Sequence, residues 1–161
     1  MNNFQHQHTA HCESGVMSTM LKAQGVDFNE AMVFGLASAL TFVYIPLVKV
    51  NGMPLISYRM PPKSIIKNVA KRLKVRLKIQ KFRAPQAGQE SLDLALAENK
   101  LVGLQTSVFW LPYFPPEMRF HFNAHNLIVY GKEHNDYLIS DPVFETVQRS
   151  EERRVGKECV S

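Results

Sequence analysis

Cys12 has the sequence surroundings of a nucleophile. A polar leader, MNNFQHQHTAH, gives way at this residue to apolar residues with helical spacing, so Cys12 lies at the predicted start of a helix. Unpaired backbone N–H groups and the positive end of the helix dipole favour a thiolate at such a position. Because the thiolate is the nucleophilic form of cysteine, the position predicts covalent catalysis, with a plain buried cysteine as the alternative.

His125 and Asp141 are the predicted partners of Cys12. His125 opens the strand-like segment AHNLIVYG, and Asp141 closes the next such segment, YLISDP. A tight turn between two antiparallel strands brings such ends side by side, so Asp141 would bind one imidazole nitrogen and leave the other for the thiol. Asn126 is predicted to face the opposite side of its strand, so that only one of the two neighbours would reach Cys12. Taken singly, His125 could be a strand-edge residue and Asp141 a turn residue before Pro142.

The elements that must position these residues are those of an α+β domain, with helices first and paired strands last. Helical spacing predicts helices over residues 12–24, 29–40, 64–73 and 91–99. Strand composition and alternation predict strands over residues 41–50, 55–60, 74–80, 101–108, 127–130 and 137–140. The first two strands are joined by Asn51-Gly52, a strong hairpin signal, and residues 109–119 form an aromatic, proline-rich loop.

The composition is that of one folded domain without a disulfide framework. The chain has 161 residues, 45% of them hydrophobic and only two of them cysteine, which favours a reducing, cytoplasmic compartment. The polar N-terminus lacks the pattern of a secretory signal. Residues 31–48 carry no charge and are long enough to span a membrane, but Gly35, Pro46 and the change to strand-like composition favour a buried helix followed by a strand.

Three segments together resemble the N-terminal domain family of butirosin biosynthesis protein H, namely HCESGVMSTMLKAQGVDFNEAMVFGLASALTFVY, HFNAHNLIVYG and ISDP. The resemblance extends over roughly residues 8–147. It implies a papain-like α+β fold and, from the family's namesake, transfer of an acyl group from a carrier-protein thioester to an amine. Cys12 would then be the nucleophile, His125 the base and Asp141 the orienting acid. The alternatives are a cysteine peptidase or amidase of the same layout and a non-catalytic binding module.

The leader contains two weaker signals. Papain-like enzymes place a glutamine shortly before the cysteine as an oxyanion donor, and Gln7 is the candidate, beside the backbone N–H of Cys12. His6, His8 and His11 have side chains that bind zinc, copper or nickel, but in a polar leader they are more often solvated, so we expect no metal and no cofactor.

A basic stretch from Lys63 to Arg83 contains nine lysines and arginines and no acidic residue. Lys74, Arg76 and Lys78 are predicted to project from one strand face, either as an ordinary solvated face or as a docking surface for an acidic acyl-carrier protein. Only one aromatic residue lies in the stretch, which disfavours nucleic acid as a partner. The expected partners are therefore an acyl-carrier protein or small thioester donor and a small amine acceptor, with no nucleic acid and no membrane.

The last residues look foreign to the domain. Residues 149–159, RSEERRVGKEC, resemble the translation of a sequencing adapter, with a natural charged tail as the alternative. We therefore expect the domain to occupy residues 1–148, the tail 149–161 to be disordered, and the C-terminal region common in the family to be missing.

Overall fold

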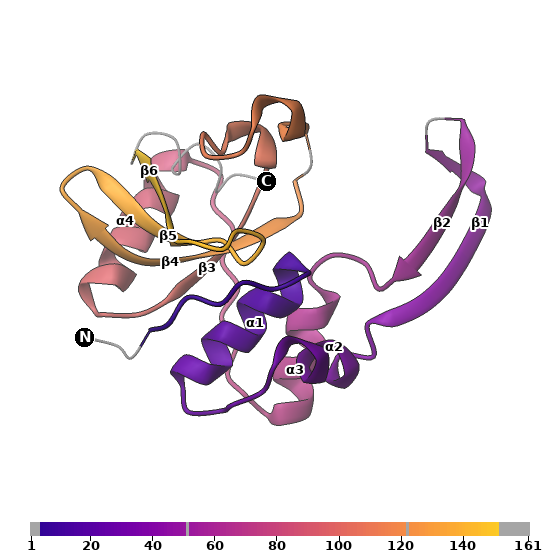
Figure 1. Ribbon diagram of the computed structural model, residues 1–161, viewed down its shortest axis with the longest axis horizontal. Coiled ribbons are helices and arrows are strands. Elements are labelled where there is room, and N and C mark those ends of the chain that lie inside the picture. Colours follow the sequence, from indigo (N-terminus) through magenta and orange to yellow (C-terminus); the bar gives the residue numbers. More distant parts are fainter. Residues whose placement is uncertain (1–3, 51, 122, 152–161) are drawn as a thin grey trace.

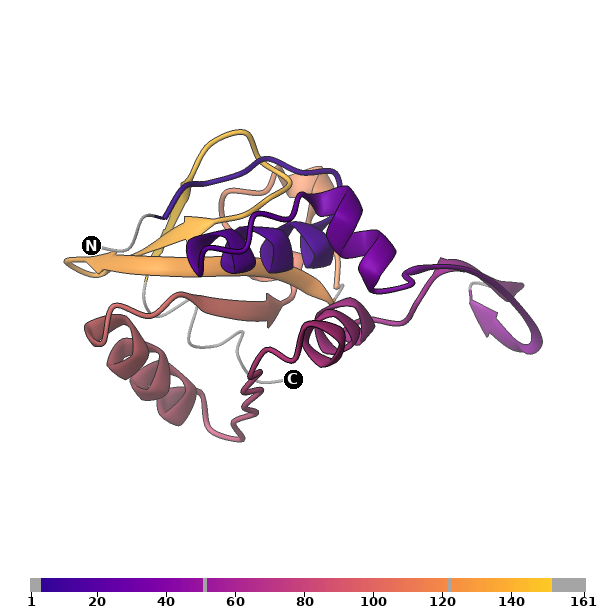
Figure 2. The ribbon, with the colours of Figure 1, turned by 90° about the horizontal axis from the view of Figure 1, so that it is seen from below.

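A four-stranded antiparallel sheet separates two groups of helices in the computed structural model, which describes residues 4–50, 52–121 and 123–151 (Figures 1 and 2). The strand order is β3-β4-β5-β6, with β3 at Val102–Thr106, β4 at His125–Glu133, β5 at Asp136–Ser140 and β6 at Gln148–Glu151. One face of the sheet packs on α1 (Cys12–Ala23), and the other packs on α4 (Pro85–Ala97). This α+β architecture confirms the predicted fold class.

Two hydrophobic clusters hold the layers together. In one, α1 packs with α2 (Glu30–Leu36) and α3 (Ser64–Leu73) through buried residues such as Leu21, Val33 and Val69. In the other, α4 and the loop after β3 cover the sheet through residues such as Leu92 and Leu111. The amphipathic spacing that predicted the helices therefore corresponds to the faces that are buried.

Strands β1 (Leu40–Val50) and β2 (Met53–Arg59) form a separate two-stranded sheet, an arm that projects from the body (Figure 1). The hairpin confirms the prediction from Asn51-Gly52, and Gly52 has a positive φ of 81°. Residues 31–48, weighed above as a membrane span, are divided between α2 and β1. Among the described residues, no helix combines the length and apolarity that crossing a bilayer requires.

The predicted strand at residues 74–80 is wrong. Lys74 ends α3 in the left-handed region, and the residues after it run as an irregular connection to α4 (Figure 2). Val75 and Ile79, predicted to be buried, are 41% and 49% exposed. An alternating pattern matches any extended segment, and among the described residues no neighbouring strand supplies the hydrogen bonds or the apolar face that a sheet requires.

Other element limits differ from the predictions in smaller ways. Helix α4 begins at Pro85, six residues earlier than predicted, because proline suits the first helical turn. Helix α2 ends at Leu36 rather than near Leu40. The expectation of disorder after residue 148 is wrong for residues 149–151, which belong to β6 and pair with β5, and Arg149 also forms an ion pair with Glu133 at 2.7 Å. Residues 152–161 of the predicted tail lie outside the described residues, and its origin stays a prediction.

Candidate active site

Cys12 is the first residue of α1, and a set of polar contacts fixes this end of the helix. His11 is the N-cap, and its Nδ1 accepts from the Ser14 backbone N–H at 3.4 Å and lies 3.0 Å from the Ser14 hydroxyl oxygen. Glu30, from the first turn of α2, accepts from the backbone N–H groups of Ala10 and His11 at 3.0 and 2.7 Å and from the Ser14 hydroxyl at 3.1 Å. The leader and the helix start are therefore held rigidly around Cys12.

Gly15 permits the close approach of the segment that follows Asp141. A Cβ at residue 15 would lie 2.9 Å from Pro142 Cβ and would collide with the Thr9 hydroxyl, so only glycine fits this position. The Thr9 backbone N–H also donates to the Pro142 carbonyl at 2.7 Å. These contacts fix the end of β5 against the first turn of α1.

His125 and Asp141 meet at the ends of neighbouring strands. The His125 Nε2 donates to Asp141 Oδ2 across 2.7 Å, and both side chains are buried. Asp141 also accepts from the Tyr113 hydroxyl at 3.0 Å and from the Val143 backbone N–H at 3.3 Å, and Phe114 stands edge-on to the imidazole with ring centroids 5.3 Å apart. Because Asp141 occupies Nε2, the ring presents its Nδ1 to Cys12.

The thiol of Cys12 hydrogen-bonds with His125, which places the imidazole between Cys12 and Asp141. Burial alone would raise the pKa of the thiol, but the hydrogen bond and charge of His125, together with hydrogen bonds from Asn126, outweigh burial and lower it. Burial would likewise lower the pKa of His125, but the hydrogen bonds to Asp141 and Cys12 raise it to about 9. The two shifts act in the same direction, toward a thiolate–imidazolium pair.

Asn126 was expected to face away from Cys12, and that prediction is wrong. Its Nδ2 lies 3.9 Å from the Cys12 Sγ and 3.0 Å from the Ala124 carbonyl, and its backbone N–H also contributes to the lowered pKa of the thiol. Strand β5 ends at Ser140, opposite Ile128, so the edge of β4 before Ile128 is open where Cys12 lies. A group at the edge of a strand is reached by side chains from both faces, which the alternation rule does not anticipate.

The leader histidines have other contacts in the structure. His6 accepts from the Ser140 hydroxyl at 2.7 Å and donates to the Phe144 carbonyl at 3.0 Å, while His11 caps α1. Within the described part of the chain, no group of three or more histidine, cysteine, aspartate or glutamate side chains is placed to bind a metal ion. Gln7 is half-buried in the same leader, and its role as an oxyanion donor stays a prediction.

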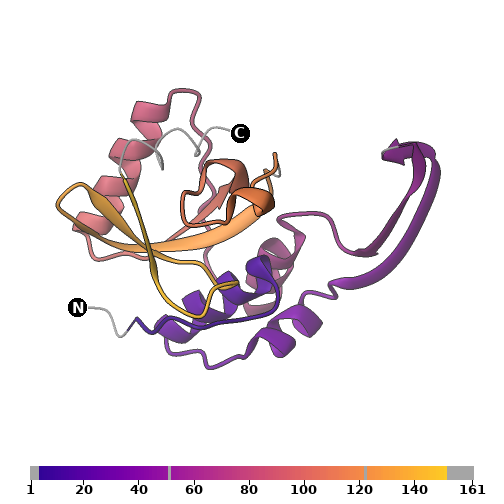
Figure 3. The same ribbon diagram turned by 45° about the horizontal axis from the view of Figure 1, so that its top comes forward.

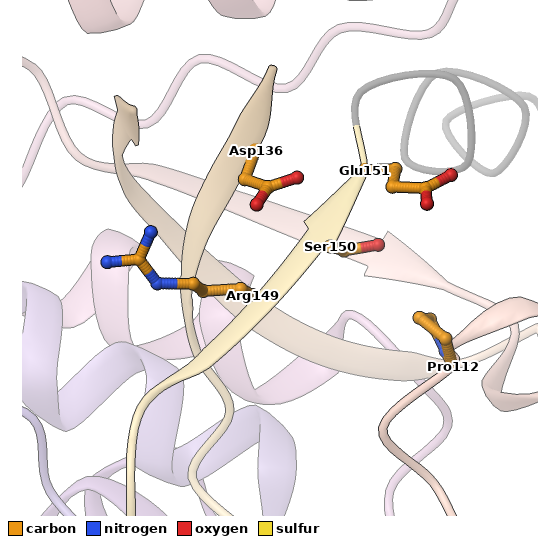
Figure 4. A pocket seen from close by; sticks show the side chains of 5 residues that line it. All are labelled: Pro112, Asp136, Arg149, Ser150 and Glu151. Carbon is orange, nitrogen blue, oxygen red and sulfur yellow. The ribbon is translucent and has the colours of Figure 1, made fainter. Parts of the chain in front are cut away.

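Lys74, Arg76 and Lys78 are exposed, but they lie on the irregular connection between α3 and α4 and not on a strand face. A separate pocket of about 280 Å³ is lined by Pro112, Asp136, Arg149, Ser150 and Glu151 at the β5–β6 edge (Figure 4). It contains none of the three predicted catalytic residues, so it lies apart from Cys12.

Comparison with known proteins identifies the family of the chain. Residues 11–142 match the family described as butirosin biosynthesis protein H, N-terminal. The chain belongs to this family. The butirosin biosynthesis protein H match includes Cys12, His125 and Asp141, and it confirms the resemblance carried by the HC-E-S and H-N-L-I-V-Y-G motifs.

A solved structure extends the comparison to the fold. The peptidase domain of Streptococcus ComA, a bi-functional ABC transporter involved in a quorum sensing pathway, is similar with a TM-score of 0.59 and 16% identity. The similarity covers 97% of this chain and 92% of that one. The chain therefore has a papain-like cysteine peptidase-type fold. No curated protein matches the chain.

Proposed function

We propose that this domain is a cysteine acyltransferase that moves an acyl group from a thioester to an amine. The observation that supports the proposal is the Cys12–His125–Asp141 arrangement, with His125 and Asp141 buried and Cys12 half-buried, in which the thiol pKa is lowered and the imidazole pKa is raised to about 9. A plain structural cysteine would need neither shift. The choice of a transferase over a hydrolase of the same layout comes from the resemblance to butirosin biosynthesis protein H.

The mechanism uses the imidazolium as acid and then as base. The Cys12 thiolate attacks the thioester carbonyl, and the C–S bond to the leaving thiol breaks while the His125 imidazolium supplies that thiol with its proton. An acyl-enzyme with a new thioester at Cys12 remains, and His125 is now neutral. An amine then attacks the carbonyl and gives a proton to His125, and cleavage of the bond to Cys12 restores the thiolate–imidazolium pair with release of the amide.

Asn126 and the start of α1 supply polar N–H groups around the reacting atoms. The Asn126 amide lies 3.9 Å from Sγ, and the backbone N–H of Cys12, at the first position of α1, has no partner within the helix. Such donors stabilise the negative charge that develops on sulfur and on the carbonyl oxygen. Asp141 orients the imidazole and stabilises its charged form without taking the proton.

The first experiment tests loading of Cys12. The full chain is incubated with a small soluble thioester, and the mass of the peptide that contains Cys12 is measured. A mass increase equal to the acyl group is expected in the wild type and in Cys159→Ser, and none is expected at this position in Cys12→Ala. Failure of both proteins that retain Cys12 to load would favour a non-catalytic binding module.

The second experiment separates transfer from hydrolysis. A primary amine is added to the loaded protein, and the amide and acid products are counted. Amide formation that requires the loaded enzyme supports a transferase. Acid as the sole product at every amine concentration would identify a hydrolase of the same fold.

We further propose that Lys74, Arg76 and Lys78 steer an acidic carrier protein toward Cys12. Exposed charges of this kind contribute little individually but together raise an association rate, and the increase falls as salt rises. The triple Lys74/Arg76/Lys78→Glu variant should lose rate with a carrier-bound thioester and keep its rate with a soluble one. Equal rates for the variant and the wild type with the carrier-bound substrate would identify the stretch as an ordinary solvated surface.

A further inference from the structure

Three aromatic side chains form an exposed cluster in the connection between β3 and β4. The Phe109 ring stacks on His121 with ring centroids 4.0 Å apart and an angle of 18° between the planes. Trp110 stands edge-on to Phe109 at 4.8 Å. Phe109 is 37% exposed and Trp110 is 52% exposed, so these rings are arranged in advance of any ligand while keeping apolar surface open to water. We call Phe109, Trp110 and His121 the aromatic platform.

The platform is attached to the candidate active site at both ends. Thr106 and His125 are partners in the β3–β4 register, so the connection leaves the sheet and returns to it beside the catalytic imidazole. Phe109 follows Thr106 by three residues, which limits their Cα separation to about 11 Å. In two views the connection lies beyond the start of β4 as seen from α1 (Figures 1 and 3). The connection that carries the platform is therefore anchored to the sheet beside His125.

The connection that carries the platform is held in place. Arg119 donates to the Phe114 carbonyl at 2.7 Å and to the Pro112 carbonyl at 2.5 Å, which ties the two halves of the connection together. Leu111 and Phe114 from the same segment are buried in the hydrophobic core. Because other residues of the segment supply its core packing, the exposed rings are free to serve binding.

The proposed reaction assigns the two sides of the site to different parts of the substrates. The acyl group is bonded to Cys12 Sγ, whereas His125 exchanges protons with the leaving thiol and then with the amine. The amine must therefore approach on the side of His125, the residue at which the connection that carries the platform rejoins the sheet. We propose that the platform binds a flat apolar ring carried by the acceptor amine, an inference that rests on the acyl transfer proposed above.

Direct binding can be measured without acyl transfer because Trp110 is the single tryptophan of the chain. Fluorescence of the full chain is titrated with 2-phenylethylamine and with n-butylamine. We expect a saturable change with the ring amine and none with the linear amine, and a weaker response to the ring amine in Phe109→Ala. Phe42→Ala, which removes an exposed ring from the β1–β2 arm, is the matched control and should respond like the wild type. Absence of a saturable change in the wild type would overturn the proposal.

A second measurement, the partitioning of the acyl-enzyme between amide and acid products, connects this binding to the reaction. With Cys12 loaded from a small thioester, the ratio of amide to acid should be between about twofold and tenfold higher for 2-phenylethylamine than for n-butylamine, the factor that one aromatic pair supplies. Trp110→Ala and Phe109→Ala should reduce that preference, and Phe42→Ala should keep it. A preference that survives in both platform variants would overturn the inference. If the ring amine binds but Cys12 is never acylated, the acyl transfer proposal fails, whereas binding of an aromatic ring by the platform is supported.

Discussion

Replacement of Asp141 by asparagine tests whether the carboxylate keeps His125 charged. Asp141 is fully buried and its Oδ2 lies 2.7 Å from the His125 Nε2, so its negative charge acts on the imidazolium with little screening. The pKa of His125 is raised to about 9, and an opposite charge at this distance accounts for about 2 pKa units. In Asp141→Asn we therefore expect the pKa of His125 to fall to about 7.

The expected loss of rate depends on pH. At pH 8 the imidazolium fraction should fall from about nine-tenths to about one-tenth, so loading of Cys12 from a small thioester should slow by about tenfold from protonation alone. At pH 6 both proteins keep His125 charged, and the protonation effect should be small. The alkaline limb of the pH–rate profile should move from about pH 9 toward about pH 7.

Mass-spectrometric loading rates between pH 5 and pH 10 provide the assay, with circular dichroism melting as the folding check. Asp136→Asn, at the other end of β5 and in the separate pocket, is the matched control and should keep the wild-type profile. An Asp141→Asn profile that keeps its alkaline limb near pH 9 would refute the electrostatic reasoning. An equal loss at pH 6 and pH 8 would do the same, because it would indicate lost orientation without a change in His125 charge.

Three further variants test the surroundings of the site. Asn126→Leu should raise the pKa of Cys12, measured as a higher midpoint for iodoacetamide alkylation against pH, while the exposed Asn123→Ala leaves the midpoint unchanged. Glu13→Ala should lower the free energy of unfolding, measured in urea, by about 1–3 kcal/mol, because Glu13 Oε1 accepts from two backbone N–H groups at the start of α3. A decrease below about 0.5 kcal/mol would contradict this expectation. Replacing residues 40–59 by a short glycine linker should leave the melting temperature within a few degrees of the wild-type value, because the Met60 N–H donates to the Ala39 carbonyl at 2.9 Å and already closes the base of the arm. Loss of cooperative melting would show that the arm is required for folding.

Local patterns predicted the elements that position the site, because burial in the folded chain follows the same periodicities. The helix that starts at Cys12 and the strands that present His125 and Asp141 were all indicated by spacing and turn residues. The same reasoning failed at residues 74–80, where alternation is perfect but the described part of the chain offers no partner strand. Strand formation depends on a neighbour distant in sequence, and a single segment does not contain that information.

The role of Asn126 was missed for a related reason. The alternation rule says from which face each side chain leaves the strand, but β4 loses its β5 neighbour before Asn126, and a group at that open edge is reached from both faces. The end of β5 at Ser140 is set by Asp141 and Pro142, which turn away to meet the leader and α1. Only the three-dimensional arrangement therefore shows that two adjacent residues of one strand contact the same sulfur atom.

The HCESG motif is distinctive because each of its five residues makes a different contact. His11 caps α1, Cys12 presents the thiol, Glu13 caps α3, and Ser14 hydrogen-bonds with Glu30. Gly15 leaves room for Pro142 next to Asp141. A nucleophile at a helix start is useful only if its base and the orienting acid are held at hydrogen-bonding distance, and these contacts fasten α1 to α2, to α3 and to the end of β5. The motif thus couples the chemistry of one residue to the packing of the whole helical layer.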